Sequence, residues 1–503
     1  EKTNTAQKGR ISVQKTGDIF TTVATASSAY TDENCETIVN PTTYTPVFAS
    51  GNLSGAVFQI IAVEDIVTLD GTIRANAGDV VAEITTDENG YAETDLLYLG
   101  KYEVREITAP DGYALNAESQ FVELTYAGQE IAVRDTVNTS FVNDYQGVEI
   151  SLSKVMEKDE LFNIGNSDEY TRVRFGLFAA ENITAADGSV IPADGLISEI
   201  SLAENMSAKF DTALPFGKYY VQEIATDEHY VLNGKKYLVN FEYMGQEVTT
   251  VTVDCGEFKN ALKRGKISGK KVDENEKSLE NALFGLFAVD TAEFTADNAY
   301  MTAVSDENGH FEFDKIPYGE YIVREIEAPT GYILSDESYP VTISEDGEVI
   351  EIKAVNKSTK VRISKQDITT GEELPGATLQ IIDEDGNVAT EWVSTDEAHF
   401  IEGKLIAGKE YTLRETIAPD GYEIASEIKF TVNTDGSVTE VVMYDEHTPD
   451  LEIPPTVTID TPNTGVSADN SAELYLVAAA VIMAFGMVIC KRNDKEQRKD
   501  DVK

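Results

Sequence analysis

The sequence has 503 residues, and its 89 Asp and Glu residues against 40 Lys and Arg residues give a formal net charge of −49. This acidity argues against nucleic-acid binding, because contacts to phosphate groups need Lys and Arg. A hydrophobic fraction of 42% excludes a wholly disordered acidic chain, and the length predicts about three to five domains. The three Cys and four His residues show neither a zinc-binding spacing nor a disulfide framework.

Four diverged repeats follow one another along the chain. The sequence begins at Glu1 without the charged and then apolar segments of a signal peptide, so a mature form or a fragment is expected. Each repeat contains a phrase like GKYEVREITAPDGYAL, and these phrases begin at Gly100, Gly217, Gly319 and Gly408. Their spacing of roughly 90–120 residues exceeds the 20–50 residues of solenoid units, so each repeat is expected to be one domain.

Segments within each repeat alternate apolar and polar residues with a period of two, and turn signals such as DG, NG and PDG separate them. This pattern predicts an all-β fold of tandem β-sandwich domains. Two stretches, about 20–50 and about 157–170, are rich in polar and small residues and are expected to be surface loops. The expected boundaries are an N-terminal linker at 1–7 and domains at 8–146, 147–263, 264–359 and 360–447.

Charged and amide side chains share the apolar face of the predicted strands, because residues i, i+2 and i+4 of a strand point the same way. In each repeat the opening strand places one Lys there, the central phrase one Glu, and the closing strand one Asn or Asp. Lys and Glu are rarely buried unless they are paired, so these residues are candidates for chemistry. They are Lys15, Lys154, Lys271 and Lys365; Glu106, Glu223, Glu325 and Glu415; and Asn143, Asn260, Asn356 and Asp445.

Amide formation between side chains is the chemistry that these groups allow. Burial lowers the pKa of a Lys amine and raises the pKa of a Glu carboxyl group. The neutral amine is then a nucleophile towards the carbonyl carbon of Asn or protonated Asp, and the Glu transfers the protons. The alternative is a fully satisfied buried network of ion pairs and hydrogen bonds without a covalent bond.

The repeats resemble the CnaB-type, or SpaA-like prealbumin-fold, domains of Gram-positive pilins and adhesins. The shared marks are the Lys of the first strand, a Gly-Ala phrase such as LSGAVFQI at Leu53, the pattern Y-x-x-x-E-x-x-A-P-x-G-Y and the closing Asn or Asp. The second repeat departs from the Y-x-x-x-E-x-x-A-P-x-G-Y pattern, with TDEHY at Thr226 to Tyr230. The resemblance implies one intramolecular isopeptide bond in each domain. The implied bonds are Lys15–Asn143 assisted by Glu106, Lys154–Asn260 by Glu223, Lys271–Asn356 by Glu325, and Lys365–Asp445 by Glu415.

The C-terminal part contains an uncharged apolar run at 474–490 and a basic tail at 491–503. As a helix, the run is near the lower length limit for crossing a bilayer, and the basic tail predicts that everything before the run lies outside the cell. A TPNTG sequence stands in the preceding linker, 448–473, and this order resembles a Gram-positive cell-wall sorting signal, with Thr in place of the first Leu of that motif. The resemblance implies that a sortase cuts between Thr and Gly and joins the chain to peptidoglycan. The motif residues are Thr461, Pro462, Asn463, Thr464 and Gly465.

Taken together, these features predict an extracellular, cell-wall-anchored stalk that presents a distal region to a host or neighbouring-cell protein or glycan. We expect no enzyme activity beyond autocatalytic bond formation, no cofactor and no metal, and a membrane contact only through 474–490 before sorting. Two alternatives remain open: a basal or tip pilin subunit, and the stalk of a surface enzyme whose catalytic domain lies upstream. A backbone pilin is disfavoured, because the sequence has SYPVT at Ser338 but no YPK-like donor motif.

Overall fold

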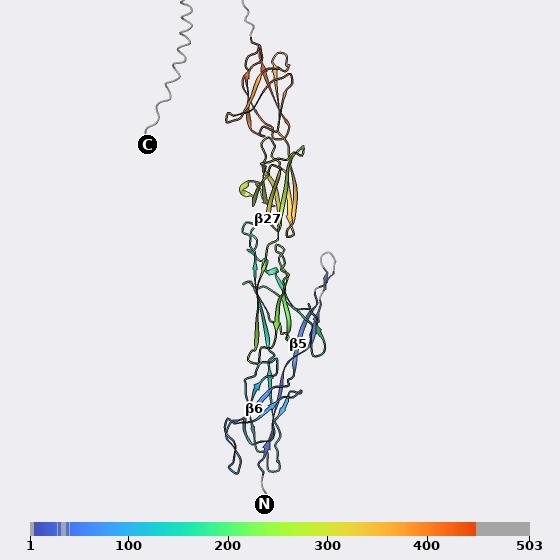
Figure 1. Ribbon diagram of the computed structural model, residues 1–503, viewed down its shortest axis with the longest axis vertical. Helices are drawn as coiled ribbons and strands as arrows, with labels where there is room; N and C mark the ends of the chain where they lie inside the picture. Colours follow the sequence, from blue (N-terminus) through green and yellow to red (C-terminus); the bar gives the residue numbers. More distant parts are fainter. Residues whose placement is uncertain (1–4, 28, 32–36, 40, 449–503) are drawn as a thin grey trace, which may run out of the picture. The chain divides into compact units, whose positions relative to one another are not determined.

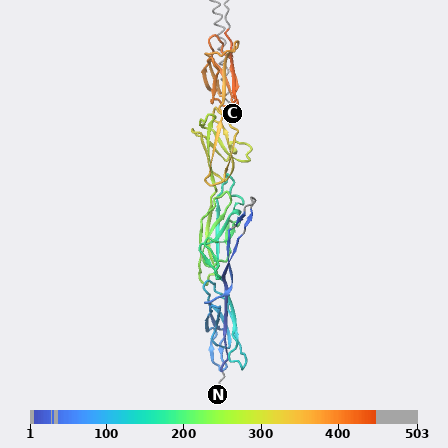
Figure 2. The same cartoon turned by 90° about the vertical axis from the view of Figure 1, so that its right-hand side faces the viewer.

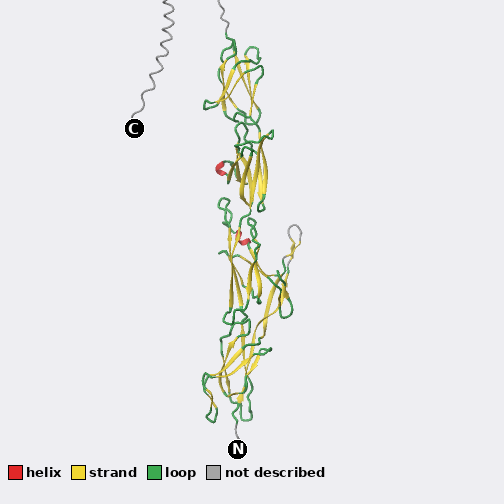
Figure 3. Ribbon diagram, in the orientation of Figure 1, coloured by secondary structure: helices red, strands yellow, loops and turns green. Residues whose placement is uncertain are grey.

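The computed structural model describes residues 5–27, 29–31, 37–39 and 41–448. Strands make up nearly all the regular structure of this part of the chain, and its helices are two short 3-10 turns, η1 (Glu169–Arg172) and η2 (Ala296–Asn298) (Figure 3). The predicted all-β fold is confirmed. None of the described helices is long and apolar enough to span a membrane, and the predicted segment at 474–490 lies outside the described residues.

Four consecutive stretches of the chain each form a β-sandwich, and the colours of Figures 1 and 2 follow them in sequence order. Domain 1 contains β1 (Lys8–Gly9), β2 (Ile11–Ala26), β3 (Ala29–Thr31), β4 (Thr37–Val39), β5 (Thr43–Asn52), β6 (Val57–Ala62), β7 (Ile66–Val67), β8 (Ile73–Ala75), β9 (Val80–Thr85), β10 (Tyr91–Glu93), β11 (Leu97–Tyr98), β12 (Gly100–Thr108), β13 (Gln120–Leu124) and β14 (Val137–Asn143). Domain 2 contains β15 (Gly147–Met156), β16 (Arg174–Ala179), β17 (Ile183–Thr184), β18 (Val190–Ile191), β19 (Leu196–Ser201), β20 (Ser207–Phe210), β21 (Gly217–Ala225), β22 (Tyr237–Phe241) and β23 (Thr250–Asn260).

The two remaining domains are shorter. Domain 3 contains β24 (Arg264–Asp273), β25 (Leu283–Ala288), β26 (Met301–Val304), β27 (His310–Pro317), β28 (Gly319–Glu327), β29 (Ser338–Ile343) and β30 (Val349–Asn356). Domain 4 contains β31 (Lys360–Asp367), β32 (Thr378–Ile382), β33 (Val388–Val393), β34 (His399–Glu402), β35 (Glu410–Ile417), β36 (Ile428–Thr431) and β37 (Val438–Asp445).

The opening strand of each domain is the centre of a three-stranded arrangement. It pairs in parallel with the closing strand and antiparallel with a strand from the middle of the domain, in the orders β10-β2-β14, β20-β15-β23, β27-β24-β30 and β34-β31-β37. Parallel neighbours need a long crossover connection, and here the crossover is the rest of the domain. The two ends of each domain's sequence therefore lie side by side in one sheet.

A four-stranded antiparallel arrangement covers the other side of each core, in the orders β13-β12-β6-β9, β22-β21-β16-β19, β29-β28-β25-β26 and β36-β35-β32-β33. The alternating apolar residues of both layers meet between them, as expected for a sandwich. In domain 3, for example, the rings of Phe284 on β25 and Phe311 on β27 stack with centroids 3.8 Å apart. The central phrase of every repeat forms the strand next to β6 or its counterpart.

The insertion at about 20–50 is not a surface loop, and this expectation was wrong. The second half of β2 and β5 form a long antiparallel ribbon, labelled at β5 in Figure 1. The ribbon reaches domain 2, where Thr43 pairs with Leu196 of β19 and Phe20 and Val23 pack against the domain 2 core. Phe20 and Val23 are three positions apart, and a register shift in the ribbon between Phe20 and Thr22 allows both of them to pack against the other domain.

The insertion at about 157–170 is largely irregular, as expected, and ends in η1. It nevertheless makes specific contacts with domain 3. The Phe162 ring lies 4.7 Å from the Tyr300 ring, and Arg264 of β24 pairs with Glu157 and Asp159 at 2.9 and 3.0 Å.

Candidate functional site

Each domain buries one Lys, one Glu and one Asn or Asp between its two layers. The Lys comes from the opening strand, the Glu from the central phrase (β12, β21, β28 and β35) and the third residue from the end of the closing strand. These twelve residues are the ones that the period-two pattern aims inward, and the most exposed of them, Glu415, is only 4% exposed. The structure thus brings together all four predicted trios.

A common strand register places the three side chains together. In each domain the Lys pairs across the parallel ladder with the residue two positions before the closing Asn or Asp, so both point into the core. The Lys pairings are Lys15 with Phe141, Lys154 with Phe258, Lys271 with Ala354, and Lys365 with Met443.

Domains 1 and 3 share one arrangement of the trio. In domain 3, the Lys271 amine donates a hydrogen bond to Asn356 Oδ1 and lies 2.9 Å from Glu325 Oε1. Asn356 Nδ2 donates to the same Glu325 oxygen at 2.9 Å. In domain 1 the amine of the trio likewise donates to the amide oxygen, and the carboxylate oxygen lies 3.1 Å from the amine and 3.0 Å from the amide nitrogen.

Domain 4 has an acid in place of the amide. The Lys365 amine donates to Asp445 Oδ1 and lies 3.0 Å from Glu415 Oε1. This second contact is an ion pair rather than a hydrogen bond, since Glu415 Oε1 has no hydrogen-bond partner. The other oxygen of the acid, Asp445 Oδ2, has no hydrogen-bond partner either. Two buried carboxyl groups next to one amine favour a proton on one of them, because like charges at close range cannot both be stabilised.

Domain 2 arranges its trio differently. The Lys154 amine donates to Glu223 Oε1 at 2.7 Å, and Asn260 Oδ1 has no hydrogen-bond partner. Asn260 Nδ2 donates to Glu223 Oε1 and also to the hydroxyl of Thr226, both at 2.9 Å. The amide oxygen therefore lacks the contact with the amine that domains 1 and 3 have.

The second oxygen of every trio Glu is held by the backbone. A main-chain N–H ten residues further along the chain, in the loop after the central phrase, donates to Oε2 in each domain. The donors are Asn116 at 3.0 Å, Asn233 at 2.8 Å, Ser335 at 3.0 Å and Ala425 at 2.7 Å. Sequence reasoning missed this support, which carries no side-chain signature.

A turn glycine supports the trio Lys in domains 1 and 3. The N–H of Lys271 donates to the carbonyl of Gly309 at 2.6 Å, and the N–H of Lys15 donates to the carbonyl of Gly90 at 2.7 Å. Both glycines have positive φ, +74° and +67°, and a Cβ at either position would clash with the carbonyl of the Lys. The DENG turns of the sequence thus fix the strand that carries the amine.

Burial shifts the pKa of five trio residues in the direction that favours their neutral forms. Burial lowers the pKa of Lys15, Lys154 and Lys271, despite the opposing effect of the nearby Glu. Burial likewise raises the pKa of Glu106 and, with the charge of the neighbouring Asp, that of Glu415. A neutral amine beside a carbonyl carbon, with a carboxyl group touching both, has the geometry for proton-assisted attack.

A family model described as SpaA, a prealbumin-like fold domain, matches residues 47–138, 265–358 and 359–447, which is more than half of the chain. The chain belongs to this family. Domain 2 lies outside the matched residues, although its strand order and the register of its trio are those of the other SpaA-family domains.

Similar proteins include a surface protein and a pilin subunit. The trypsin-resistant surface T6 protein of Streptococcus pyogenes serotype M6 is 26% identical over 233 residues, which cover 45% of this chain and 36% of that protein. Among solved structures, the Bacillus anthracis TIE protein is 19% identical with a TM-score of 0.40, covering 80% of this chain and 70% of that one. BcpA, the major pilin subunit of Bacillus cereus, is 17% identical with a TM-score of 0.30, covering 70% of this chain and 100% of that one.

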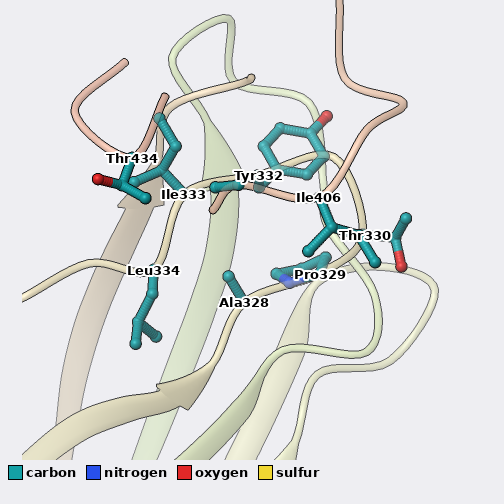
Figure 4. Close-up of a pocket in the computed structure, with 9 residues that line it drawn as sticks. Ala328, Pro329, Thr330, Tyr332, Ile333, Leu334, Ile406 and Thr434 are labelled. Atoms are coloured by element: carbon teal, nitrogen blue, oxygen red, sulfur yellow. The ribbon is translucent and has the colours of Figure 1, made fainter. Parts of the chain in front are cut away.

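The other candidate sites are of a different kind. A hollow lined by Pro329, Ile333 and Leu334 of domain 3 and by Ile406 and Thr434 of domain 4 is mainly apolar and contains no trio residue (Figure 4). Among the described residues, no group of three or more His, Cys, Asp or Glu side chains could hold a metal ion. The predicted sorting motif, Thr461–Gly465, lies outside the described residues.

Proposed function

We propose that this chain is a cell-surface stalk whose SpaA-family domains are locked by intramolecular isopeptide bonds. The observation that carries the proposal is the repeated buried contact between a Lys amine and a side-chain carbonyl group, bridged by a Glu, in domains 1, 3 and 4. A bond there joins the opening and closing strands of a domain. The bond Lys154–Asn260 of domain 2, which the sequence predicts, is not part of this proposal, because the contacts of that amide differ.

The proposed reaction needs no external reagent. In domains 1 and 3 the neutral Lys Nζ attacks Asn Cγ while the protonated Glu gives its proton to the carbonyl oxygen. The Glu carboxylate then takes a proton from the attacking nitrogen and passes it to the departing nitrogen. It recovers the proton of the oxygen as one ammonia leaves and the Nζ–Cγ amide forms. In domain 4 the same attack on protonated Asp445 releases one water. Holding the reactants in contact replaces a slow bimolecular reaction by an intramolecular one. The product is uncharged, so it removes the cost of burying an ion pair.

The mass of the purified full chain tests this reaction. We expect it to be lower than the sequence mass by at least two ammonias and one water. Proteolytic digestion should yield branched peptides that join Lys15 to Asn143, Lys271 to Asn356 and Lys365 to Asp445. The full sequence mass, with linear peptides at all three places, would refute the proposal.

We propose that a sortase attaches the stalk to peptidoglycan through Thr464. The order of the TPNTG motif, the apolar run and the basic tail supports this proposal, as does the relation to a streptococcal surface protein. Replacing Thr464 by Ala should move the protein from the wall fraction to the membrane fraction of the producing cells. An unchanged wall fraction would contradict sortase anchoring at this motif.

A further inference from the structure

The amide of Asn260 in domain 2 is bound by one acceptor more than its counterparts in domains 1 and 3. Glu223 Oε1 accepts from its nitrogen as in those domains, but the Thr226 hydroxyl accepts from the same nitrogen at 2.9 Å. The amide oxygen, which in domains 1 and 3 accepts from the Lys amine, has no partner here. Among the described residues, Glu223 is the one hydrogen-bond partner of the Lys154 amine.

Thr226 occupies a position that is Ala in the other three domains. It is the third residue after the trio Glu in the central phrase, and the equivalent residues are Ala109, Ala328 and Ala418. The methyl group of Ala cannot accept a hydrogen bond. A second acceptor at the amide nitrogen is therefore a property of domain 2.

The loop that carries Thr226 is held in place by a buried carboxylate. Asp227, where the other domains have Pro, is 1% exposed. It accepts a hydrogen bond from Arg172 at 2.6 Å and contacts His229 Nδ1 at 2.6 Å. Burial opposes ionisation of Asp227, but these partners lower its pKa below the usual value, so the anchor is charged at neutral pH. The Thr226 hydroxyl is thereby fixed at the Asn260 amide.

The backbone of domain 2 does not account for the difference by itself. A bulge interrupts the pairing of β15 with β23 between Ser151 and Ser153, but the register is restored at Lys154, which pairs with Phe258 as its counterparts do. Asn260 thus starts from the same strand position as Asn143 and Asn356. The altered contacts begin at the side chains.

We infer that the hydrogen bond from Asn260 to the Thr226 hydroxyl keeps the amide oxygen from contacting the Lys154 amine, and that domain 2 therefore lacks the covalent bond. This inference rests on the function proposed for domains 1, 3 and 4. Attack requires the amine at the carbonyl group and a nitrogen that is free to leave with a proton from Glu223. With its nitrogen shared between Glu223 and Thr226 and its oxygen away from the amine, Asn260 meets neither condition, and Lys154 stays paired with Glu223.

Three substitutions in the full chain test the role of the hydroxyl. Thr226→Ala introduces the residue of the other domains, Thr226→Val removes the hydroxyl at nearly constant volume, and Thr226→Ser keeps it. After proteolysis, peptide mass spectrometry should find the Lys154 and Asn260 peptides linear in the wild type and in Thr226→Ser. Both should join, with loss of one ammonia, in Thr226→Ala and Thr226→Val, and adding Glu223→Gln to Thr226→Ala should restore linear peptides.

Each other outcome overturns the inference. A branched Lys154–Asn260 peptide in the wild type would show that Thr226 withholds nothing. Linear peptides in both Thr226→Ala and Thr226→Val would place the cause elsewhere, in the β23 bulge. The Lys271–Asn356 peptide of the same samples is the internal reference: if it is linear as well, the proposed function itself has failed, a result distinct from both of these.

Discussion

Domains 2 and 3 share an arrangement of seven strands, to which domain 2 adds the β17–β18 pair, and they have the same pairing register at the trio Lys, but their trios differ in one contact. In domain 3 the amine touches the amide oxygen, and in domain 2 it does not. The fold therefore brings the reactive residues together without deciding whether they are aligned for reaction. In the inference drawn above, this alignment depends on Thr226, a residue outside the trio and three positions after the Glu.

The two domains also differ in what the family model recognises. It matches domain 3 in full and leaves domain 2 out, although the sandwich of domain 2 is complete. The central phrase of domain 2 has Thr226 and Asp227 in place of the Ala and Pro of the other repeats, and Thr226 contacts Asn260 of the trio. Two of the residues in which domain 2 differs from the other repeats therefore lie next to its trio, while the strand order of the sandwich is retained.

The largest expected effect comes from removing the proton-transferring group in a domain whose trio is aligned. Glu415→Ala in domain 4 should prevent the loss of one water and leave Lys365 and Asp445 unlinked. A cross-link over 80 residues is worth about 4 kcal/mol of unfolding free energy, so calorimetry should show the domain 4 transition lowered by on the order of 20 °C.

The matched control is Glu327→Ala, which changes an exposed Glu two residues after the trio Glu of domain 3. The mass deficit and the unfolding temperatures should stay at their wild-type values. An equal mass deficit in Glu415→Ala and the wild type would show that this Glu is not needed for the reaction.

A smaller effect is expected from the turn that supports Lys271. Gly309→Ala puts a side chain at φ +74°, where it also clashes with the carbonyl of Lys271, and should slow ammonia loss in domain 3 as followed by the mass of newly synthesised chains sampled at intervals after a pulse of expression. Gly347→Ala has a similar φ of +78° in open space and pays only the backbone strain of about 1 kcal/mol. Equal rates in the two variants would show that the turn does not position the amine.

The smallest effect is a pH dependence that distinguishes domain 2. Burial lowers the pKa of Lys154 below its usual 10.5, so between the lowered value and 10.5 the unfolded chain binds the proton more strongly than the folded one. The stability of domain 2 should then rise with pH across that window, by about 1.4 kcal/mol per unit of pKa difference. Denaturant titrations of the wild type and of Lys154→Met/Glu223→Gln at several pH values isolate this contribution. A difference in unfolding free energy between the two proteins that does not change with pH would contradict a free amine at Lys154.

Much of this site follows from local sequence rules. The period of two in the strands is enough to place Lys15, Glu106 and Asn143 on the inner face, because burial and strand alternation act on neighbouring residues. The ribbon of β2 and β5 could not be predicted in this way. Its stabilising partner, β19, lies far away in the sequence, and a segment rich in Thr and Ala resembles a loop until that partner is known.

The contact of Thr226 with Asn260 is an intermediate case. The replacement of Ala by Thr is visible when the four central phrases are aligned, but its consequence depends on the rotation of one amide group. That rotation is set by the two hydrogen bonds that the amide nitrogen donates, to Glu223 and to Thr226, while the amide oxygen has no partner. Such a balance is a property of the folded core and has no local sequence signature.

The parallel pairing of opening and closing strands has a mechanical consequence. The chain enters each sandwich at one end and leaves it at the other, so tension along the chain shears the whole ladder of hydrogen bonds at once instead of opening them one by one. In a linked domain such as domain 3, the pull would pass from Lys271 directly to Asn356, and the residues between them would carry none of it. If domain 2 is unlinked as inferred, it would be the domain that unfolds under tension, releasing on the order of 350 Å of chain and refolding when the tension ends.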